Sequence, residues 1–408
     1  MNYELVSGGG VTSATGFVAG VAQAAIKKAD GYDLTLLYST VPAVGAGVFT
    51  QNVFRAAPVI ISQQNLSVND TEGTIRGIVV NSGCANACTG QQGLLDAQQM
   101  AQEAAKVFAC EETEILVAST GVIGVNLPME RVIAGIHEAG NDLSAANGGL
   151  AAQAIMTTDT VSKEIAIKFY LGEKEITLGG MAKGSGMIHP NMATMLGFIT
   201  TDAAISGRCL KKSLQEAVGK SFNMVTVDGD CSTNDSLFVL ANGLAENQLI
   251  MDENSQEYQI FTRALTYVCT ELAKMIARDG EGATKLMEVR VINAPNPEDA
   301  RLGAKAIAGS NLVKAALFGE DANWGRIVCA LGYSGASFQP MLVDVYLGDL
   351  LVAQNGGGLA FDEEMAARIL QEDTVIITVD MKQGSSQATA WGCDLTYDYV
   401  KINGEYRT

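Results

Sequence analysis

Residues 179–196 concentrate the side chains of this sequence that could carry out chemistry. The segment is predicted to be a glycine-rich loop. It reads GGMAKGSGMIHPNMATML and places a lysine, a histidine and a threonine among closely spaced glycines. Such glycines let backbone N–H groups approach a ligand, and Lys183 adds a cation. A phosphate-binding loop is one interpretation, but the order G-x-x-x-x-G-K-[ST] is absent and Lys183 precedes the glycines that it should follow. We therefore consider chemistry other than nucleotide binding.

Acyl transfer by a hydroxyl group needs a base beside the nucleophile, and the sequence contains two histidines, His137 and His189. His137 lies in a stretch with helical character, residues 132–138, which favours a place on the surface or in the core. His189 stands beside Pro190 in the glycine-rich segment. It is either the base of a catalytic triad or an ordinary solvated loop residue.

A base can also be supplied without histidine, by the α-amino group of an N-terminal residue. Its pKa of about 7.7 to 8.0 lets it accept a proton at neutral pH. Cleavage before Thr194 would make this threonine both nucleophile and base. The small Ala193 would let the hydroxyl reach the preceding carbonyl, for an N-to-O acyl shift followed by hydrolysis. The simpler interpretation of the same residues is that 193–199 opens an ordinary buried strand or helix.

The elements that must position these residues follow from the hydrophobic pattern. Residues 77–81, 115–119 and 375–379 are short β-branched runs bounded by turn residues, which predicts buried strands. Residues 94–108 and 260–278 have apolar side chains at helical spacing. Strands alternating with helices predict an α/β or α+β layered protein, with sites where strands run out into glycine-rich loops. No internal repeat or low-complexity tract interrupts the pattern.

The amino-acid composition indicates which classes of binding partner are unfavourable for this protein. The 408 residues carry a formal net charge of −18 without a run of Lys and Arg, which disfavours nucleic acid and anionic membranes. The first residues do not have the pattern of a secretory signal, and no stretch is apolar for long enough to span a bilayer. The eight cysteines are scattered without a CxxC pair. Together with two histidines they predict free thiols, no metal site and a cytoplasmic location.

Residues 181–196, together with 156–160, resemble the signature of the ornithine acetyltransferase (ArgJ) family of arginine biosynthesis. The resemblance covers essentially the whole chain. In that family a precursor cuts itself at the Ala-Thr bond of a KGxGMxxPxMATML stretch. Carried over, the bond is Ala193–Thr194, which implies an α chain of residues 1–193 and a β chain of 194–408 with Thr194 as nucleophile. The resemblance also implies an α+β layered, ArgJ/DmpA-like fold and an α2β2 heterotetramer.

The resemblance implies further site residues, residue by residue. Residues 119–124 are similar to the family's oxyanion-hole loop, so that Thr120 and Gly121 would stabilise a tetrahedral intermediate. The positions that match the family's substrate-binding residues are Thr157, Lys183, Thr194, Glu281, Asn403 and Thr408. Lys183 is suited to the α-carboxylate of the substrate and Glu281 to the cationic amine of ornithine.

Three other stretches resemble the family. The tail, residues 400–408, is expected to fold back into the site. Residues 227–235 and 319–326 match without a catalytic or binding role, and the former is interpreted as a structural loop near the site. The former has metal-like oxygen spacing but lacks the bidentate Glu of an EF-hand, which argues against calcium.

The function implied is transfer of acetyl from N2-acetylornithine to glutamate through an acetyl-threonine, without cofactor. Bifunctional members also use acetyl-CoA as donor, and no CoA-specific motif decides this. Two alternatives stay open at this point. One is a self-processed aminopeptidase or amidohydrolase of similar fold, and the other is an uncleaved binding protein for acidic or amino-acid ligands.

Overall fold

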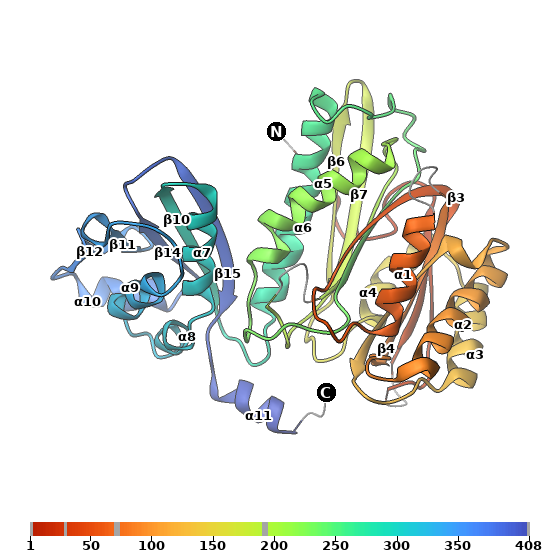
Figure 1. Cartoon of the computed structure of the whole chain (residues 1–408), viewed down its shortest axis with the longest axis horizontal. Coiled ribbons are helices and arrows are strands. Elements are labelled where there is room, and N and C mark those ends of the chain that lie inside the picture. The colour runs from red at the N-terminus through yellow and green to blue at the C-terminus, as the bar shows by residue number, and fades with distance from the viewer. Residues whose placement is uncertain (1–2, 28–30, 69–73, 190–194, 406–408) are drawn as a thin grey trace.

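The computed structural model describes residues 3–27, 31–68, 74–189 and 195–405, which form a mixed α/β protein with a larger and a smaller sheet (Figure 1). The larger sheet has the order β1-β6-β7-β8-β9-β3-β4-β5, with β2 paired to β3. Its strands are β1 (Glu4–Leu5), β2 (Phe17–Ala22), β3 (Leu34–Phe49), β4 (Ile75–Cys84), β5 (Ile115–Val122), β6 (Lys163–Leu171), β7 (Lys174–Lys183), β8 (Leu196–Thr201) and β9 (Ser236–Ala241).

The smaller sheet has the order β13-β12-β11-β14-β10-β15 and comes from the C-terminal part of the chain. Its strands are β10 (Leu286–Ala294), β11 (Asp344–Leu347), β12 (Leu350–Gln354), β13 (Gly357–Gly358), β14 (Thr374–Asp380) and β15 (Ser386–Cys393). The predicted strands at 77–81, 115–119 and 375–379 correspond to β4, β5 and β14, so these predictions are confirmed.

The helices fill the connections between strands. The α-helices are α1 (Ala57–Val68), α2 (Gly90–Phe108), α3 (Met129–Asn141), α4 (Gly148–Ala154), α5 (Gly207–Lys220), α6 (Gln256–Arg278), α7 (Pro297–Ala308), α8 (Asn311–Phe318), α9 (Trp324–Gly332), α10 (Glu363–Leu370) and α11 (Tyr397–Glu405). Short 3₁₀ helices are η1 (Glu112–Glu114), η2 (Ala145–Asn147), η3 (Phe222–Met224) and η4 (Pro340–Leu342). The helices predicted at 94–108 and 260–278 are confirmed as α2 and α6.

The long strand β3 joins two halves of the larger sheet. Its first part pairs with β2 and β4, and its last part, Val44–Phe49, pairs with β9. The two halves lie face to face, because Phe198 and Phe238 from β8 and β9 are buried in one core with Ile78 and Leu116 from β4 and β5. Apolar faces on both halves explain why the strands read as continuous hydrophobic runs in the sequence.

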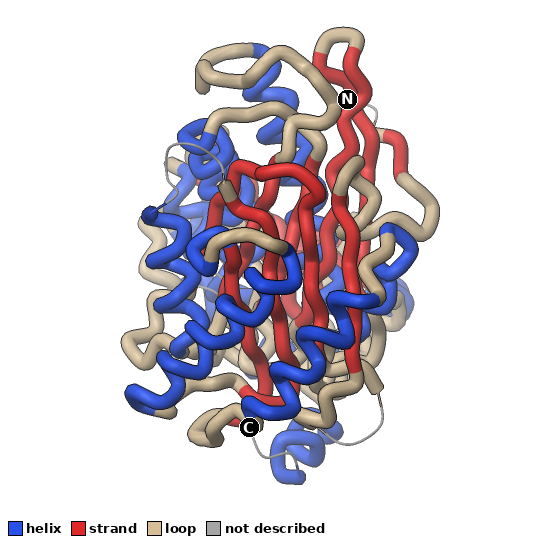
Figure 2. Tube along the Cα trace, turned by 90° about the vertical axis from the view of Figure 1, so that its right-hand side faces the viewer, coloured by secondary structure: helices blue, strands red, loops and turns tan. Residues whose placement is uncertain are grey.

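Helices cover the two outer faces of these half-sheets. Helices α5 and α6 pack over β6 to β9, and α1, α2 and α3 cover the half that contains β2, β4 and β5 (Figures 1 and 2). Helix α6 begins where Ser255 caps it by accepting a hydrogen bond from the Tyr258 N–H. Its buried stripe includes Phe261, Leu265 and Leu272. The result is a helix-sheet-sheet-helix arrangement, which confirms the prediction of a layered α/β fold.

One part of the prediction is wrong: residues 179–183 do not belong to a glycine-rich loop but form the end of strand β7. A Cβ atom on Gly179 would lie 2.1 Å from the carbonyl oxygen of Gly10, so glycine is needed here for close backbone approach within the fold. The turn itself begins at Gly184, whose φ is 155°. Gly179 is therefore required for close packing, and Gly184 for the turn.

The predicted α and β chains would share the larger sheet. Strand β7 lies before the expected cleavage point and pairs antiparallel with β8, which lies after it. Strand β8 in turn pairs parallel with β9. The division at 193/194 stays a prediction, but its two parts are joined by a strand-strand pairing and a common core. The smaller sheet, between residues 286 and 393, is a further unit that the sequence analysis did not separate.

No helix in the described part of the chain combines the length and apolar character needed to cross a bilayer.

Candidate active site

The structure brings five of the predicted site residues to one cavity, where strands β5 and β7 end. The cavity measures about 70 Å³, roughly the share of two water molecules in liquid water. It is lined by Ala85, Thr120, Gly121, Ile123, Thr157, Thr158, Lys183, Met187, Ser232, Thr233, Asn234 and Glu281. These residues come from both halves of the larger sheet and from the connection between α6 and β10. A space of this size suits a short acyl group.

The predicted oxyanion loop is held in one backbone conformation. Thr120 and Gly121 lie in register with Ser82 and Gly83 of the parallel strand β4. The φ of Gly121 is 130°, and a Cβ atom there would lie 2.3 Å from the carbonyl carbon of Gly83. Glycine is therefore required by both conformation and space. A rigid strand end of this kind provides the preorganisation that an oxyanion site needs.

Lys183 is a buried cation that faces this loop. Its Nζ atom lies 3.5 Å from Oγ1 of Thr120 and 3.9 Å from Oδ2 of Asp159. Burial lowers the pKa of Lys183, and the attraction of Asp159 opposes this shift only in part. The nearest counterion of this ammonium group, Asp159, is at the outer limit of an ion pair and is also bound by Lys163 at 2.7 Å. The ammonium group is placed to gain a partner when an anionic substrate enters.

Asp159 organises the groups behind Lys183. Its carboxylate accepts hydrogen bonds from the backbone N–H groups of Thr157 and Gly184 and from Nζ of Lys163 at 2.7 Å. Burial alone would raise the pKa of Asp159, but Lys183, Lys163 and these hydrogen bonds outweigh it and lower the pKa to about 2. Asp159 is therefore ionised and fixes Thr157 and the turn at Gly184 in position.

Glu281 forms the opposite wall of the cavity and is connected to the C-terminal helix. Its backbone N–H donates to the carbonyl of Ser185, and its Oε2 accepts from Nδ2 of Asn403 at 2.7 Å. A Cβ atom on Gly186 would lie 2.4 Å from the Glu281 carboxylate, so the glycine leaves room for it. Asn403 belongs to α11, so the described part of the predicted tail does reach the site.

Three predicted residues, Ala193, Thr194 and Thr408, lie outside the described residues. The nucleophile, the cleavage position and the last substrate-binding residue therefore stay predictions.

Comparison with known proteins assigns the chain to a protein family. Its residues 18–408 match the model of the ArgJ family. The chain belongs to the ArgJ family. The arginine biosynthesis bifunctional protein ArgJ of Symbiobacterium thermophilum is 57% identical to it, over 98% of this chain and 99% of that protein. The protein of the same name from Bacillus subtilis is 48% identical, over 98% of this chain and 97% of its own length.

A solved structure agrees with this assignment. The crystal structure of the arginine biosynthesis bifunctional protein ArgJ from Bacillus halodurans is 48% identical and superposes with a TM-score of 0.51. The match covers 52% of this chain and all of that chain. The predictions of the ArgJ family, of its fold and of an acyltransferase of arginine biosynthesis are therefore confirmed.

Residues 227–235, which the sequence indicates to be a structural loop near the site, connect the parts of the ArgJ site from behind. Asp228 accepts hydrogen bonds from the N–H groups of Met187 and Ile188, and Nδ2 of Asn234 donates to the carbonyls of Ala85 and Ser119. These contacts link the two sides of the cavity. The oxygen spacing of this stretch resembles a metal loop, but the structure shows that Asp228 and Asn234 bind backbone atoms far away in the chain.

Asp235 is a second group that sequence reasoning missed. Its carboxyl is buried at the start of β9, and its Oδ2 has no hydrogen-bond partner in the described part of the chain. Burial raises the pKa of this carboxyl well above its usual value, although the charge of Lys183 opposes the shift. The site thus pairs one carboxyl that is readily ionised, Asp159, with one that favours its neutral form.

The described residues were also compared with the ligand sets of metal sites. Within residues 3–27, 31–68, 74–189 and 195–405, no three His, Cys, Asp or Glu side chains gather in a group that could hold a metal ion.

The other unassigned stretch, 319–326, lies beside the smaller sheet, where Glu320 pairs with Lys285 and Trp324 begins α9.

The two histidines differ in their relation to the site. His137 lies on the exposed side of α3, where its Nε2 is 3.2 Å from a Glu103 oxygen. His189 is half-buried, and its Nδ1 is 2.9 Å from Oγ1 of Thr226. Burial and the charge of Lys305 lower the pKa of His189 to about 4. This imidazole is therefore neutral and a weak base at neutral pH.

We predict that His189→Gln changes kcat/KM for acetylornithine by no more than about threefold, since a base of such low pKa contributes little at neutral pH. Steady-state kinetics between pH 5 and 9 would measure it. The same profile for the unaltered enzyme is expected to lack an ionisation near 6.5. A loss of about 100-fold or more, the size expected for removal of a general base, would identify His189 as the base instead.

We predict that Asn403→Ala raises the KM for acetylornithine by about tenfold, because Glu281 loses the amide that fixes its carboxylate. Initial rates at varied acetylornithine would show the change in KM with a smaller change in kcat. Lys401→Ala is the matched control, since Lys401 is an exposed residue of the same helix. Equal KM values in the two variants would contradict the role of Asn403.

Proposed function

We propose that the chain is a self-cleaving glutamate N-acetyltransferase that moves acetyl from N2-acetylornithine to glutamate and also accepts acetyl-CoA as donor. One observation carries the proposal: a cation, Lys183, and a carboxylate, Glu281, line the same small cavity as the rigid strand end at Thr120 and Gly121. Acetylornithine carries one carboxylate and one ammonium group, which these two side chains complement. The relatives named bifunctional in arginine biosynthesis support both donors.

In the proposed reaction the Thr194 hydroxyl oxygen bonds to the acetyl carbon, and the bond from that carbon to the ornithine nitrogen breaks. The α-amino group of Thr194 takes the hydroxyl proton and passes it to the leaving amine. The amine nitrogen of glutamate then bonds to the acetyl carbon, and the bond from that carbon to the Thr194 oxygen breaks. A proton from the glutamate amine passes through the α-amino group to this oxygen and restores the hydroxyl. The strand end at Thr120 and Gly121 stabilises the oxyanion in both steps. No cofactor takes part.

Processing into two chains belongs to the proposal. The strands β7 and β8 pair directly on either side of the expected cut, so the fragments would remain associated after cleavage. The Bacillus halodurans chain is matched over its whole length by only about half of this chain, as a two-chain protein would be. An α2β2 assembly and a cytoplasmic location complete the proposal. The latter is supported by the eight cysteines, all of which are free thiols.

The test follows acetyl from labelled acetylornithine in the presence and absence of glutamate. The expected result is rapid formation of acetylglutamate, with much slower release of acetate to water. Faster release to water than to glutamate would instead establish a self-processed hydrolase. A second arm replaces acetylornithine with acetyl-CoA and is expected to give acetylglutamate as well.

A further inference from the structure

Asp279 is a buried carboxylate at the end of helix α6, and it does not line the active-site cavity. It directly follows Arg278, the last residue of the helix. A carboxylate at this end of a helix is electrostatically unfavourable, because the terminal carbonyl groups carry partial negative charge. Its side chain accepts hydrogen bonds from the N–H and the hydroxyl of Thr160 and from Nζ of Lys163 at 2.6 Å. Asp279 is therefore explained by these contacts and not by helix formation.

Asp279 is the outermost of four buried side chains that alternate in charge, here called the charge row. Lys163 lies 2.6 Å from Asp279 and 2.7 Å from Asp159, and Asp159 lies 3.9 Å from Nζ of Lys183. None of the four side chains is more than 10% exposed. The two lysines balance the two carboxylates, which lets these charges remain inside the protein. Of the four, Lys183 alone lines the cavity.

Lys163 connects the two ends of the charge row, because both carboxylates bind it. Burial lowers the pKa of Lys183, and the positive charge of Lys163 adds to this shift, whereas Asp159 opposes it. If Asp279 lost its charge, Asp159 would be the one carboxylate left in the row for two lysines. The repulsion between the lysines would then be less well compensated. Loss of the charge on Asp279 should therefore make the ammonium form of Lys183 less stable.

The other charged groups around Lys183 lie outside the charge row. Asp235 and Glu281 attract its ammonium group, and Lys27 repels it. Burial raises the pKa of Asp235 well above its usual value, so the neutral form of this carboxyl is favoured. Glu281 forms the opposite wall of the cavity, where it is expected to bind the substrate amine. The charge of Lys183 therefore depends mainly on Asp159 and on the groups that share it.

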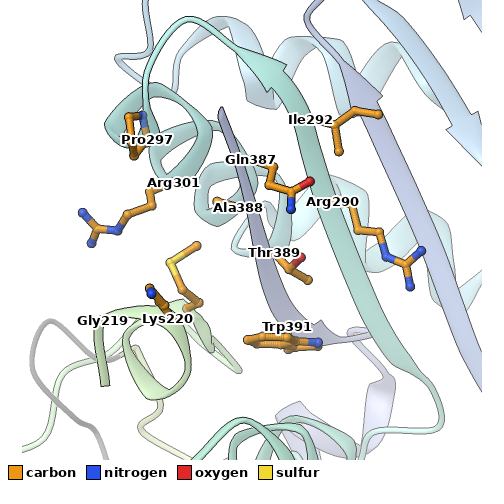
Figure 3. Close-up of a pocket in the computed structure, with 11 residues that line it drawn as sticks. Gly219, Lys220, Arg290, Ile292, Pro297, Arg301, Gln387, Ala388, Thr389 and Trp391 are labelled. Atoms are coloured by element: carbon orange, nitrogen blue, oxygen red, sulfur yellow. The ribbon is translucent and has the colours of Figure 1, made fainter. Parts of the chain in front are cut away.

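The basic residues beside the smaller sheet are arranged differently. Figure 3 shows Arg290 and Arg301 in the cavity between α5 and strands β10 and β15, with their side chains pointing away from each other. Arg290 pairs with Glu288 and Arg301 with Glu298, each at 2.6 Å, and the two arginine side chains are 45% and 41% exposed. Water screens such pairs, so they depend little on distant charges. The charge of Lys183, which is buried, depends on the whole row.

We infer that Asp279 is a positioning residue for substrate binding, because it maintains the charge of Lys183 through Lys163 and Asp159. The inference rests on the proposed function, in which Lys183 binds the α-carboxylate of the substrate. Asp279 does not line the cavity, so it is not placed to touch the reacting groups. It should affect the affinity for substrates that carry a carboxylate and leave the reaction of bound substrate nearly unchanged.

The experiment measures the affinity of the whole enzyme for ornithine by titration calorimetry between about pH 6 and 10. Ornithine has the same α-carboxylate as acetylornithine. Asp279→Asn keeps the shape of the side chain and removes its charge. A cation that binds a carboxylate is lost as the pH rises through its pKa, so the affinity of the variant should fall about one pH unit below the point at which that of the unaltered enzyme falls. Ornithine itself ionises equally in every experiment, so the difference between proteins is the result.

Steady-state kinetics provide the second measurement. On the alkaline side of this fall, the KM for acetylornithine should be about tenfold higher in Asp279→Asn than in the unaltered enzyme, with kcat within about threefold. Asp373→Asn is the matched control. Asp373 is a 93% exposed carboxylate that lies 3.7 Å from Arg278 at the same end of α6, so the control removes an equal charge outside the charge row. It should change neither the pH dependence nor the KM.

A double variant separates the effect of charge from that of packing. Asp279→Asn/Lys163→Met also removes the lysine that Asp279 had neutralised and leaves Asp159 to Lys183 alone. Its affinity for ornithine should be higher than that of Asp279→Asn, although two buried residues have been changed. Thermal unfolding identifies the preparations that are folded. A folded double variant that binds ornithine no better than the single variant would contradict the inference.

Three further results would overturn the inference. If the affinity of Asp279→Asn fell at the same pH as that of the unaltered enzyme, Asp279 would not control Lys183. A loss of kcat larger than the rise in KM would indicate a role in the chemical step. An equal shift in Asp373→Asn would show a general effect of charge. These results refute the inference alone, whereas unaltered enzyme that neither binds ornithine nor transfers acetyl from acetylornithine would refute the proposed function.

Discussion

Replacing Thr194 with alanine is expected to leave a single uncut chain without acetyl-transfer activity. Alanine has no hydroxyl to attack the preceding carbonyl, so the N-to-O shift cannot begin. Without cleavage position 194 gains no free α-amino group either, so nucleophile and base are lost together. We expect kcat to fall by at least about 10⁴-fold, the scale on which removal of a covalent nucleophile acts.

Intact-mass measurement under denaturing conditions provides the readout. The unaltered protein should give two species, residues 1–193 and residues 194–408, which elute together under native conditions because β7 and β8 pair across the cut. Thr194→Ser keeps the hydroxyl and the amine and should be cut and active. A single full-length species from active, unaltered protein would contradict the mechanism and return the chain to the class of uncleaved proteins.

Much of the layered fold could be predicted from the sequence, because its strands and helices have strong local patterns. The apolar stripe of α6 and the β-branched run of β5 are examples. The tertiary contacts that single residues make could not be predicted. Gly179 looks like part of a turn, and only the carbonyl of Gly10 beside it shows that it is a strand residue.

The candidate site likewise contains residues that could be predicted from the sequence and residues that could not. Thr120, Lys183 and Glu281 came from a resemblance to the family, and the structure shows them on one cavity. Asp159 and Asn234 act through backbone groups that are distant in sequence, so no local spacing marks them.

The second large effect is expected from Lys183→Met, and it is best understood beside Lys163. Both lysines are buried near Asp159, but their contacts differ. Nζ of Lys163 lies 2.7 Å from Asp159 and 2.6 Å from Asp279, so it is a fully paired structural cation. Lys183 is 3.9 Å from Asp159, and burial lowers its pKa, which means that the free site disfavours its charge.

These differences predict opposite results for two equal substitutions. Lys163→Met leaves two buried carboxylates without their shared partner and should lower the free energy of unfolding by about 3–5 kcal/mol. Lys183→Met removes a charge that burial disfavours, and Asp159 keeps its closer bond to Lys163, so the free energy of unfolding should change much less than in Lys163→Met. The kcat/KM of Lys183→Met for acetylornithine should fall by about 100-fold or more, because the substrate carboxylate loses its buried cation.

Thermal unfolding and acetyl-transfer kinetics on the same two preparations separate these effects. A Lys183→Met protein as unstable as Lys163→Met, with kcat/KM preserved in the folded fraction, would assign Lys183 to folding and not to substrate binding.

The lowered pKa of Lys183 also predicts how substrate affinity depends on pH in the unaltered enzyme. Because a bound carboxylate would raise the lowered pKa of Lys183, substrate binding should draw a proton onto this group, and the affinity for acetylornithine should weaken as the pH rises through the pKa of the free site.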